Sequence, residues 1–280
     1  LSQGSIEAGE NTTVINQGLI SSQDQITFQQ ASPINDGRME AKGDISFPHC
    51  QTFTNQSKGD LFSETGQITW PEVQIFTNEG AISSQKSVRL PHLSTFTNKG
   101  TFQSNERIDI IASKEVVNEK TLTAPLGLTL KGKTATVINK GDMGSEGDVV
   151  IQADDLTNLN SLGSSHGNLT LEVTQGENHH TIFGQDVSLH PSQAFENHHT
   201  LKAYKNLVVE GTGELENKKD ITVGETLTFK NKSLTNRAHL QAEGKINLGE
   251  TIQVLNTSQA EILSQGSIEA GENTTVINQG

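Results

Sequence analysis

The sequence predicts an all-β fold, a parallel β-helix (β-solenoid) of about 13 rungs with ~20 residues each. Three observations support it. Apolar and polar residues alternate over short stretches, and an asparagine recurs every 19 to 23 residues. Only 32% of the 280 residues are hydrophobic and 4% aromatic. So few apolar residues cannot fill a thick core, whereas a solenoid needs only a few buried side chains per rung.

One asparagine anchors each rung. An apolar residue usually lies two places earlier, and residues two places apart on a strand point to the same face. The asparagine side chain is therefore expected to point inward, where an unpaired amide would cost roughly 1–3 kcal/mol. We therefore expect the amides of adjacent rungs, about 4.8 Å apart, to form a structural hydrogen-bonded ladder. The alternative is that asparagine only tolerates a left-handed turn conformation. The anchors are Asn16, Asn35, Asn55, Asn78, Asn98, Asn118, Asn139, Asn158, Asn178, Asn197, Asn217, Asn236, Asn256 and Asn278.

Each rung is predicted to contain three short strands, because it carries three stretches of period-two alternation. The first ends at the anchor, as in Phe76 and Asn78. The second has an apolar and then a small residue four and six places after the anchor, as in Ile82 and Ser84, and the third an apolar pair near ten and twelve. A helical repeat is disfavoured, since its apolar residues would recur at spacings of three and four.

Two turns are predicted to be longer than the others. After Asn55 and Asn256 the next inward residues slip by two places, to Leu61 and Ile262. The slip preserves the inward face, as an alternating strand requires. Glycine two places after the anchor is expected to supply the turn in several rungs, namely at Gly18, Gly37, Gly80, Gly100 and Gly141.

The segment LSQGSIEAGENTTVINQG occupies residues 1–18 and returns unchanged at 263–280. The offset of 262 residues equals the distance from Asn16 to Asn278, a whole number of rungs. We therefore expect residues 1–280 to form a single β-solenoid segment, consisting of one 262-residue repeat with 263–280 starting the next copy. Neighbouring identical repeats would stack end to end.

Charge and composition exclude several classes of partner. The net charge is −13 and no basic stripe is present, so nucleic acid is not expected as a partner. No apolar run approaches the ~18 residues that cross a bilayer, so membrane insertion is not expected, and no signal segment leads the chain. Cys50 is the one cysteine and excludes an internal disulfide.

Two pairs of histidines, His179/His180 and His198/His199, follow the anchor in adjacent rungs and are expected to stack. Four imidazoles could hold Zn²⁺ or Ni²⁺. An exposed polar turn in a duplicated rung is the favoured interpretation, because Lys218/Lys219 follow in the next rung and would repel a dication. No metal, cofactor or cofactor-binding residue is therefore expected.

Enzymatic activity is not expected either. A β-helical polysaccharide lyase or hydrolase needs outward carboxylates clustered beside Arg or Lys. Asp44, Asp154 and Asp155 lie in different rungs and near predicted turns, so no catalytic residue is assigned. Glycan-acceptor sequons are attributed to the abundance of Asn and Thr; they begin at Asn11, Asn55, Asn168, Asn231 and Asn256.

The succession of Asn, Gly, apolar and small residues in VINQGLISS, FTNEGAISS and VINKGDMGS resembles the ~20-residue repeats of filamentous haemagglutinin and related two-partner-secreted bacterial exoproteins. The resemblance covers essentially the whole chain. It implies a right-handed parallel β-helix that serves as a shaft of a secreted or bacterial cell-surface filament, outside the cell. No amino-terminal secretion domain or terminal toxin of that family is recognisable.

The expected function is therefore structural, with rigidity and reach supplied by stacked rungs. Lateral self-association of shafts is a further expectation. An adhesin module whose outward faces bind host glycans or proteins, through a host-cell receptor, is the alternative. A β-helical polysaccharide-degrading enzyme is the third and least favoured interpretation.

Overall fold

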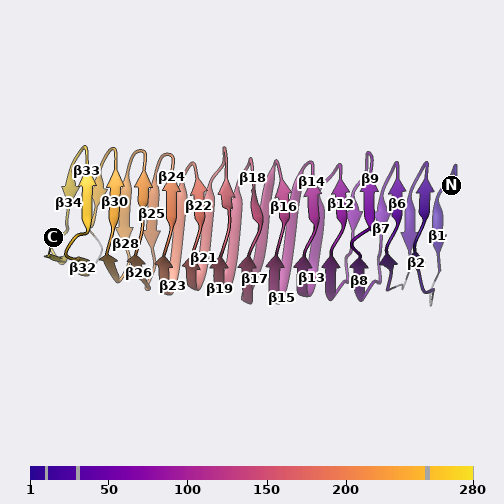
Figure 1. Cartoon of the computed structure of the whole chain (residues 1–280), viewed down its shortest axis with the longest axis horizontal. Helices are drawn as coiled ribbons and strands as arrows, with labels where there is room; N and C mark the ends of the chain where they lie inside the picture. Colours follow the sequence, from indigo (N-terminus) through magenta and orange to yellow (C-terminus); the bar gives the residue numbers. More distant parts are fainter. Residues whose placement is uncertain (10–11, 30–31, 250–252, 280) are drawn as a thin grey trace. The chain divides into compact units, whose positions relative to one another are not determined.

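The computed structural model describes residues 1–9, 12–29, 32–249 and 253–279. These residues form strands and turns and contain no helix. The chain divides into two compact units, Leu1–Ala135 with Lys140–Ser145, and Thr136–Asn139 with Glu146–Gly280. In each unit short parallel strands stack rung upon rung (Figure 1), and the rungs of both units together number about 13. The predicted all-β solenoid fold is confirmed.

In the first unit, one sheet is made of the strands that follow each anchor: β3 (Leu19–Ser22), β6 (Arg38–Ala41), β9 (Asp60–Ser63), β12 (Ala81–Ser84), β14 (Thr101–Ser104), β16 (Thr121–Ala124) and β18 (Asp142–Ser145). Strands that end at or near the anchor are β2 (Ile15–Asn16), β5 (Ile34–Asn35), β8 (Thr52–Asn55) and β11 (Ile75–Asn78). The third strands of the rungs are β1 (Ile6–Ala8), β4 (Ile26–Phe28), β7 (Ile45–Ser46) and β10 (Ile68–Thr69). In later rungs the third strand continues into the next anchor strand, as in β13 (Val88–Asn98), β15 (Arg107–Asn118) and β17 (Gly127–Asn139), the last of which ends in the second unit.

The second unit repeats this plan. The strands after the anchors are β20 (Leu162–Ser164), β22 (Thr181–Gly184), β24 (Thr200–Ala203), β27 (Ile221–Val223), β30 (His239–Ala242) and β33 (Glu261–Ser264). Continuous strands are β19 (Val149–Asn158), β21 (Leu169–Asn178) and β23 (Val187–Asn197). The remaining strands are β25 (Leu207–Glu210), β26 (Glu214–Asn217), β28 (Leu227–Lys230), β29 (Ser233–Asn236), β31 (Ile246–Asn247), β32 (Gln253–Asn256), β34 (Ile268–Glu269) and β35 (Thr275–Asn278).

The register between rungs places like residues on top of one another. Asn78 of β11 pairs with Asn98 of β13 in the first unit, and Asn158 of β19 pairs with Asn178 of β21 in the second. Because strand side chains alternate between faces, this pairing sets inward residues above inward residues, apart from local register shifts such as those between Leu90 and Thr95 of β13. The side chains of each face therefore form columns along the stack.

The two longer turns lie where the slip was predicted. Leu61 pairs with Met39 across β6 and β9, and Ile262 pairs with Leu240 across β30 and β33. In both pairs the apolar side chains stay in the same column. The two extra residues of each turn therefore lie between the anchor and the start of the next strand.

Aromatic residues fill part of the first unit's interior. Trp70 stacks on Phe47 with ring centroids 5.4 Å apart and meets Phe76 edge-on at 5.0 Å. Phe76 in turn stacks on Phe96 at 5.3 Å. All four are fully buried. The second unit relies instead mainly on leucine, isoleucine and valine from the same columns.

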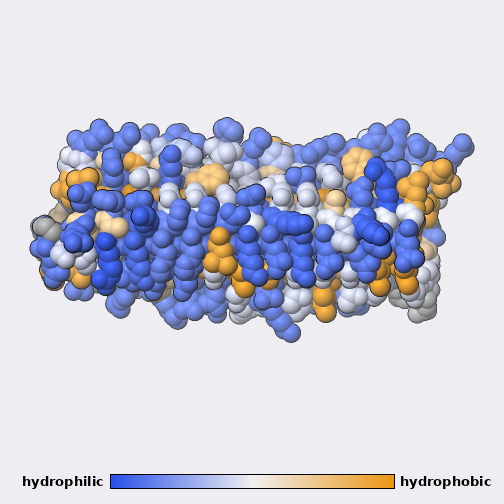
Figure 2. All heavy atoms as spheres, viewed as in Figure 1, coloured by the Kyte–Doolittle hydropathy of each residue, from blue (hydrophilic) through white to orange (hydrophobic). Residues whose placement is uncertain are grey.

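The outer surface is mainly polar. Figure 2 shows the face in view covered largely by hydrophilic residues, with hydrophobic residues in small groups between them. Tyr204 and Ile75 are among the large hydrophobic side chains that are exposed. No helix among the described residues is long and apolar enough to cross a membrane.

Candidate functional site

A ladder of asparagine amides runs through the rungs of each unit, and its members are buried except for the exposed Asn278. In every described step the side-chain nitrogen Nδ2 donates to the Oδ1 of the next anchor, so the amide dipoles within each unit point the same way. In the first unit the steps are Asn16 to Asn35 (2.7 Å), Asn35 to Asn55, Asn55 to Asn78, Asn78 to Asn98 and Asn98 to Asn118 (2.8 Å each). In the second they are Asn139 to Asn158 (2.9 Å), Asn158 to Asn178 (2.8 Å), Asn178 to Asn197 (2.8 Å), Asn197 to Asn217 (2.9 Å), Asn217 to Asn236 (2.8 Å), Asn236 to Asn256 (2.8 Å) and Asn256 to Asn278 (2.9 Å).

The same nitrogen also reaches a backbone carbonyl of the next rung. Asn98 Nδ2 donates to the carbonyl oxygen of Thr121 at 2.8 Å, and Asn178 Nδ2 donates to that of Thr200 at 3.0 Å. Each amide thus holds two strands of the following rung on either side of the turn. Cooperative polarisation strengthens such aligned chains of hydrogen bonds.

The left-handed alternative for the anchors is wrong. Among the described residues, Gln259 is the one non-glycine residue with a positive φ, 76°. The anchors therefore have ordinary strand conformations, and their shared residue type is explained by the ladder.

The glycines two places after the anchors lie in the bends that follow them, as expected, but a positive φ is not the reason. Positive φ among the described glycines occurs at Gly127 and Gly211, not at the positions two places after the anchors. A Cβ on Gly100 would lie 1.9 Å from the carbonyl oxygen of Gly80, and one on Gly37 would lie 2.2 Å from that of Gly18. Glycine is needed at Gly37 and Gly100 because adjacent rungs approach so closely there.

Charged side chains flank the ladder on the outside of the second unit. Glu177, Glu196 and Glu216 immediately precede their anchors and pair in register across β21, β23 and β26. His179 and His198 immediately follow theirs, and their rings stack with centroids 4.5 Å apart. The predicted stacking of the histidines is therefore present in the structure.

Each of these histidines bonds to the glutamate of its own rung. Nε2 of His179 lies 2.8 Å from Glu177 Oε2, and Nε2 of His198 lies 3.0 Å from Glu196 Oε2. The second pair, His180 and His199, stacks at 5.1 Å with nearly parallel rings.

Lys218 follows in the next rung and joins two of the glutamates. Its Nζ lies 2.5 Å from Glu196 Oε2 and 3.2 Å from Glu216 Oε2. The hydrogen bond from Lys218 lowers the pKa of Glu196, and the same bond raises the pKa of Lys218. Burial raises the pKa of Glu216, but hydrogen bonds from Arg237 and Lys218 outweigh it, so the net shift is downward.

A hollow of about 390 Å³ adjoins this row of charges, and its carboxylate-bearing lining residues are Asp155, Glu177 and Glu196. The expectation that Asp154 and Asp155 lie near turns is wrong, because both lie within β19. Sequence reasoning missed this grouping of acids from adjacent rungs. Aligning the residues one and three places before each anchor would have found it. Asp44 lies in the first unit, where its Oδ1 accepts a hydrogen bond from the backbone N–H of Gln67 at 2.9 Å.

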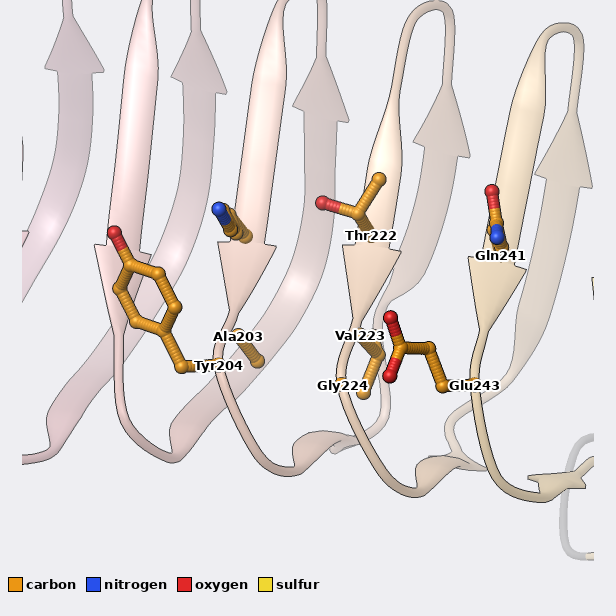
Figure 3. Close-up of a pocket in the computed structure, with 8 residues that line it drawn as sticks. Ala203, Tyr204, Thr222, Val223, Gly224, Gln241 and Glu243 are labelled. Atoms are coloured by element: carbon orange, nitrogen blue, oxygen red, sulfur yellow. The ribbon is translucent and has the colours of Figure 1, made fainter.

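A second hollow, of about 400 Å³, lies over β24, β27 and β30 (Figure 3). Tyr204 borders one side of it and the neighbouring Gln241 and Glu243 the other, with Thr222 between the two sides. The Nζ of Lys202 lies 4.5 Å from the centre of the Tyr204 ring. The only signal in the sequence was that this is the single tyrosine of the chain.

The remaining candidate residues are Cys50 and the asparagines of the sequons. Cys50 is buried, its Sγ donates to the Thr52 carbonyl at 3.0 Å, and burial raises the pKa of its thiol to about 12. Among the sequons, Asn55, Asn231 and Asn256 are buried, whereas Asn168 is exposed. Asn11 lies outside the described residues.

Comparisons with protein-family models, with curated proteins and with solved structures found no match. The fold and the side chains described above therefore carry the functional argument.

Proposed function

We propose that this protein is a structural segment of an extracellular shaft, in which stacked rungs supply length and stiffness. The observation that carries the proposal is the asparagine ladder, which in each unit bonds one rung to the next in every described step. A repeated internal amide column gives every rung the same neighbours. A solenoid built in this way lengthens by adding rungs without needing a new kind of interface.

The likeness of the anchor motif to the repeats of filamentous haemagglutinin and related two-partner-secreted exoproteins supports a place on the bacterial surface or in a secreted filament. The single buried cysteine and the acidic, polar exterior fit such a setting. The exact 18-residue repetition at an offset of 262 residues supports stacking of identical repeats. These features together favour a shaft over a compact binding domain.

Electron microscopy or small-angle X-ray scattering on chains with one and two 262-residue repeats tests this proposal. With rungs about 4.8 Å apart, the second repeat should lengthen the particle by roughly 60 Å at constant width. A two-repeat particle that thickens instead of lengthening would overturn the shaft.

The second candidate is an adhesin, and the hollow beside Tyr204 is the observation that favours it. Tyr204 is 45% exposed, and an aromatic face beside amide and carboxylate groups suits a sugar ring, which has an apolar face and hydroxyl edges. A glycan array with the protein tests this. Binding that is lost in Tyr204→Ala and kept in Tyr204→Phe would support the adhesin, and no binding by the unchanged protein would reject it.

A further inference from the structure

The side chains of Glu177, His179 and His198 converge on the outside of the second unit. Each offers one ligand atom, and these atoms all lie within 4.8 Å of one another. The side chains remain accessible, with exposed fractions of 53%, 38% and 29%. An ion could therefore reach the cluster from solvent without any change in the fold.

We propose that Glu177, His179 and His198 form a binding site for a divalent ion of the zinc and nickel class. Imidazole nitrogen and carboxylate oxygen are the donors that such ions take in proteins. Three protein ligands leave a fourth position for water, as in open tetrahedral sites. The ion takes the place of the hydrogen bond that now joins His179 and Glu177 at 2.8 Å.

The register of the solenoid builds this site. Asn178 and Asn197 pair across β21 and β23, so the histidine after each anchor is set one rung above the other. The two rings are nearly parallel, with 12° between their planes. Glu196 Oε2 lies 3.0 Å from His198 Nε2 and holds that imidazole in place.

Lys218 is the main electrostatic objection to a dication. Its ammonium group, however, lies 2.5 Å from Glu196 and 3.2 Å from Glu216, so two carboxylates already neutralise it. Glu177 pairs with no lysine or arginine in the described part of the chain, and it adjoins the hollow that Asp155 and Glu196 also line. The local charge at Glu177 therefore favours a cation.

The second histidine pair supplies a matched control. His180 and His199 belong to the same two rungs and also stack, but neither belongs to the group of converging ligand atoms. Replacing either pair removes two imidazoles from the surface and leaves the ladder intact. Any difference between the two double variants therefore reports the position of the ligands rather than the histidine content.

Isothermal titration of the whole chain with ZnCl₂, free of any polyhistidine tag, tests the proposal. We expect one ion per chain, with binding at least about ten-fold weaker in His179→Asn/His198→Asn and in Glu177→Gln. His180→Asn/His199→Asn should bind as the unchanged protein does. Circular dichroism and thermal melting without metal should be the same for all variants, because these side chains lie on the surface.

Co²⁺ provides a spectroscopic readout, since four-coordinate Co²⁺ absorbs visible light more strongly than the hydrated ion. The band should appear with the unchanged protein and with His180→Asn/His199→Asn, and disappear with Glu177→Gln. Absence of Zn²⁺ binding to the unchanged protein would overturn the site. Equal loss in the two histidine double variants would also overturn it, because binding would then be a general property of the exposed imidazoles.

Discussion

The Nδ2 atom of Asn98 lies 2.8 Å from the Oδ1 atom of Asn118, and both side chains are fully buried. Asn98 in turn accepts a hydrogen bond from Asn78 at 2.8 Å. Each amide is therefore both donor and acceptor in a fully buried column. A change at one anchor leaves a polar atom without its partner in the rung before and in the rung after.

Asn98→Leu should destabilise the protein strongly. The substitution removes the acceptor of Asn78 and the donor to Asn118, and each stranded group costs about 1–3 kcal/mol when buried. We expect a lower denaturant midpoint and an overall loss of at least about 2 kcal/mol. Urea unfolding followed by circular dichroism measures both.

Lys99→Ser is the matched control for that variant. Lys99 is exposed, and its Nζ lies 3.6 Å from Glu79 Oε1. Surface pairs of this kind contribute about 0–1 kcal/mol. If Asn98→Leu unfolds at the same urea concentration as Lys99→Ser, the ladder does not stabilise the fold.

The ladder positions could be predicted because they depend on the period of the sequence. An anchor every 19 to 23 residues, with an apolar residue usually two places earlier, determines both the stacking and the inward direction of Asn98. The reason for Gly100 could not be predicted in the same way. Glycine is needed there because the carbonyl oxygen of Gly80 lies close to the Cα of Gly100. The sequence pattern does not give the distance between the backbones of adjacent rungs.

The contacts of the charged side chains beside the ladder could be predicted only in part. The register of His179 and His198 follows from their positions after the anchors. Lys218 forms ion pairs with both Glu196 and Glu216. These pairs could not be predicted, because they depend on the rotamers of long, flexible side chains, and the period of the sequence does not specify rotamers. The hollow beside Tyr204 could not be predicted either, because it depends on the shape of the surface.

Gly100→Ala should destabilise the protein, although replacing glycine by alanine usually stabilises a protein by reducing the conformational entropy of the unfolded chain. The new Cβ would lie 1.9 Å from the Gly80 carbonyl oxygen, so the two rungs must move apart. Overpacking of this kind costs about 1–3 kcal/mol. Gly18→Ala is the comparison, since no atom lies within 4 Å of the added methyl group there. Equal thermal midpoints for the two variants would contradict the close approach as the reason for glycine.

Trp70→Phe should be tolerated far better than Trp70→Ala. Among the described residues, Trp70 Nε1 is the buried side-chain atom that has no hydrogen-bond partner. Phenylalanine removes this stranded N–H and keeps a ring against Phe47 and Phe76, so we expect a change within about 1 kcal/mol. Alanine leaves a cavity and should cost about 3–5 kcal/mol. Unfolding free energies of the two variants decide the matter, and a phenylalanine variant as unstable as the alanine variant would count against this account.

Cys50 should resist alkylation in the folded protein. Burial raises the pKa of its thiol from a usual value of 9.0 to about 12, so almost no thiolate forms at pH 8. The stability that this shift contributes is complete below about pH 9 and is lost as the pH rises towards 12. Iodoacetamide at pH 8 should modify Cys50 slowly in buffer and rapidly in denaturant. Equal rates in the two conditions would contradict the buried, neutral thiol.

The two copies of the 18-residue segment have strands at matching places. β1 begins at Ile6 and β34 at Ile268, while β2 ends at Asn16 and β35 at Asn278. Asn278 accepts a hydrogen bond from Asn256 at 2.9 Å, and its counterpart Asn16 donates to Asn35 at 2.7 Å. A chain in which the second repeat continues beyond residue 280 would therefore present the counterpart of Asn35 to Asn278 in the register that Asn16 and Asn35 already show.

We expect a chain with two repeats to continue the ladder through this junction and to unfold at a higher urea concentration than a chain with one, because added rungs bring added nearest-neighbour interfaces. Asn278→Leu should then lower the midpoint of the two-repeat chain about as much as Asn98→Leu does, since both anchors would be interior members of the ladder. Lys99→Ser, made in the first copy of the two-repeat chain, should leave the midpoint unchanged. Two repeats that unfold at the midpoint of one, with no response to Asn278→Leu, would mean that the ladder stops at the junction and that the copies are independent.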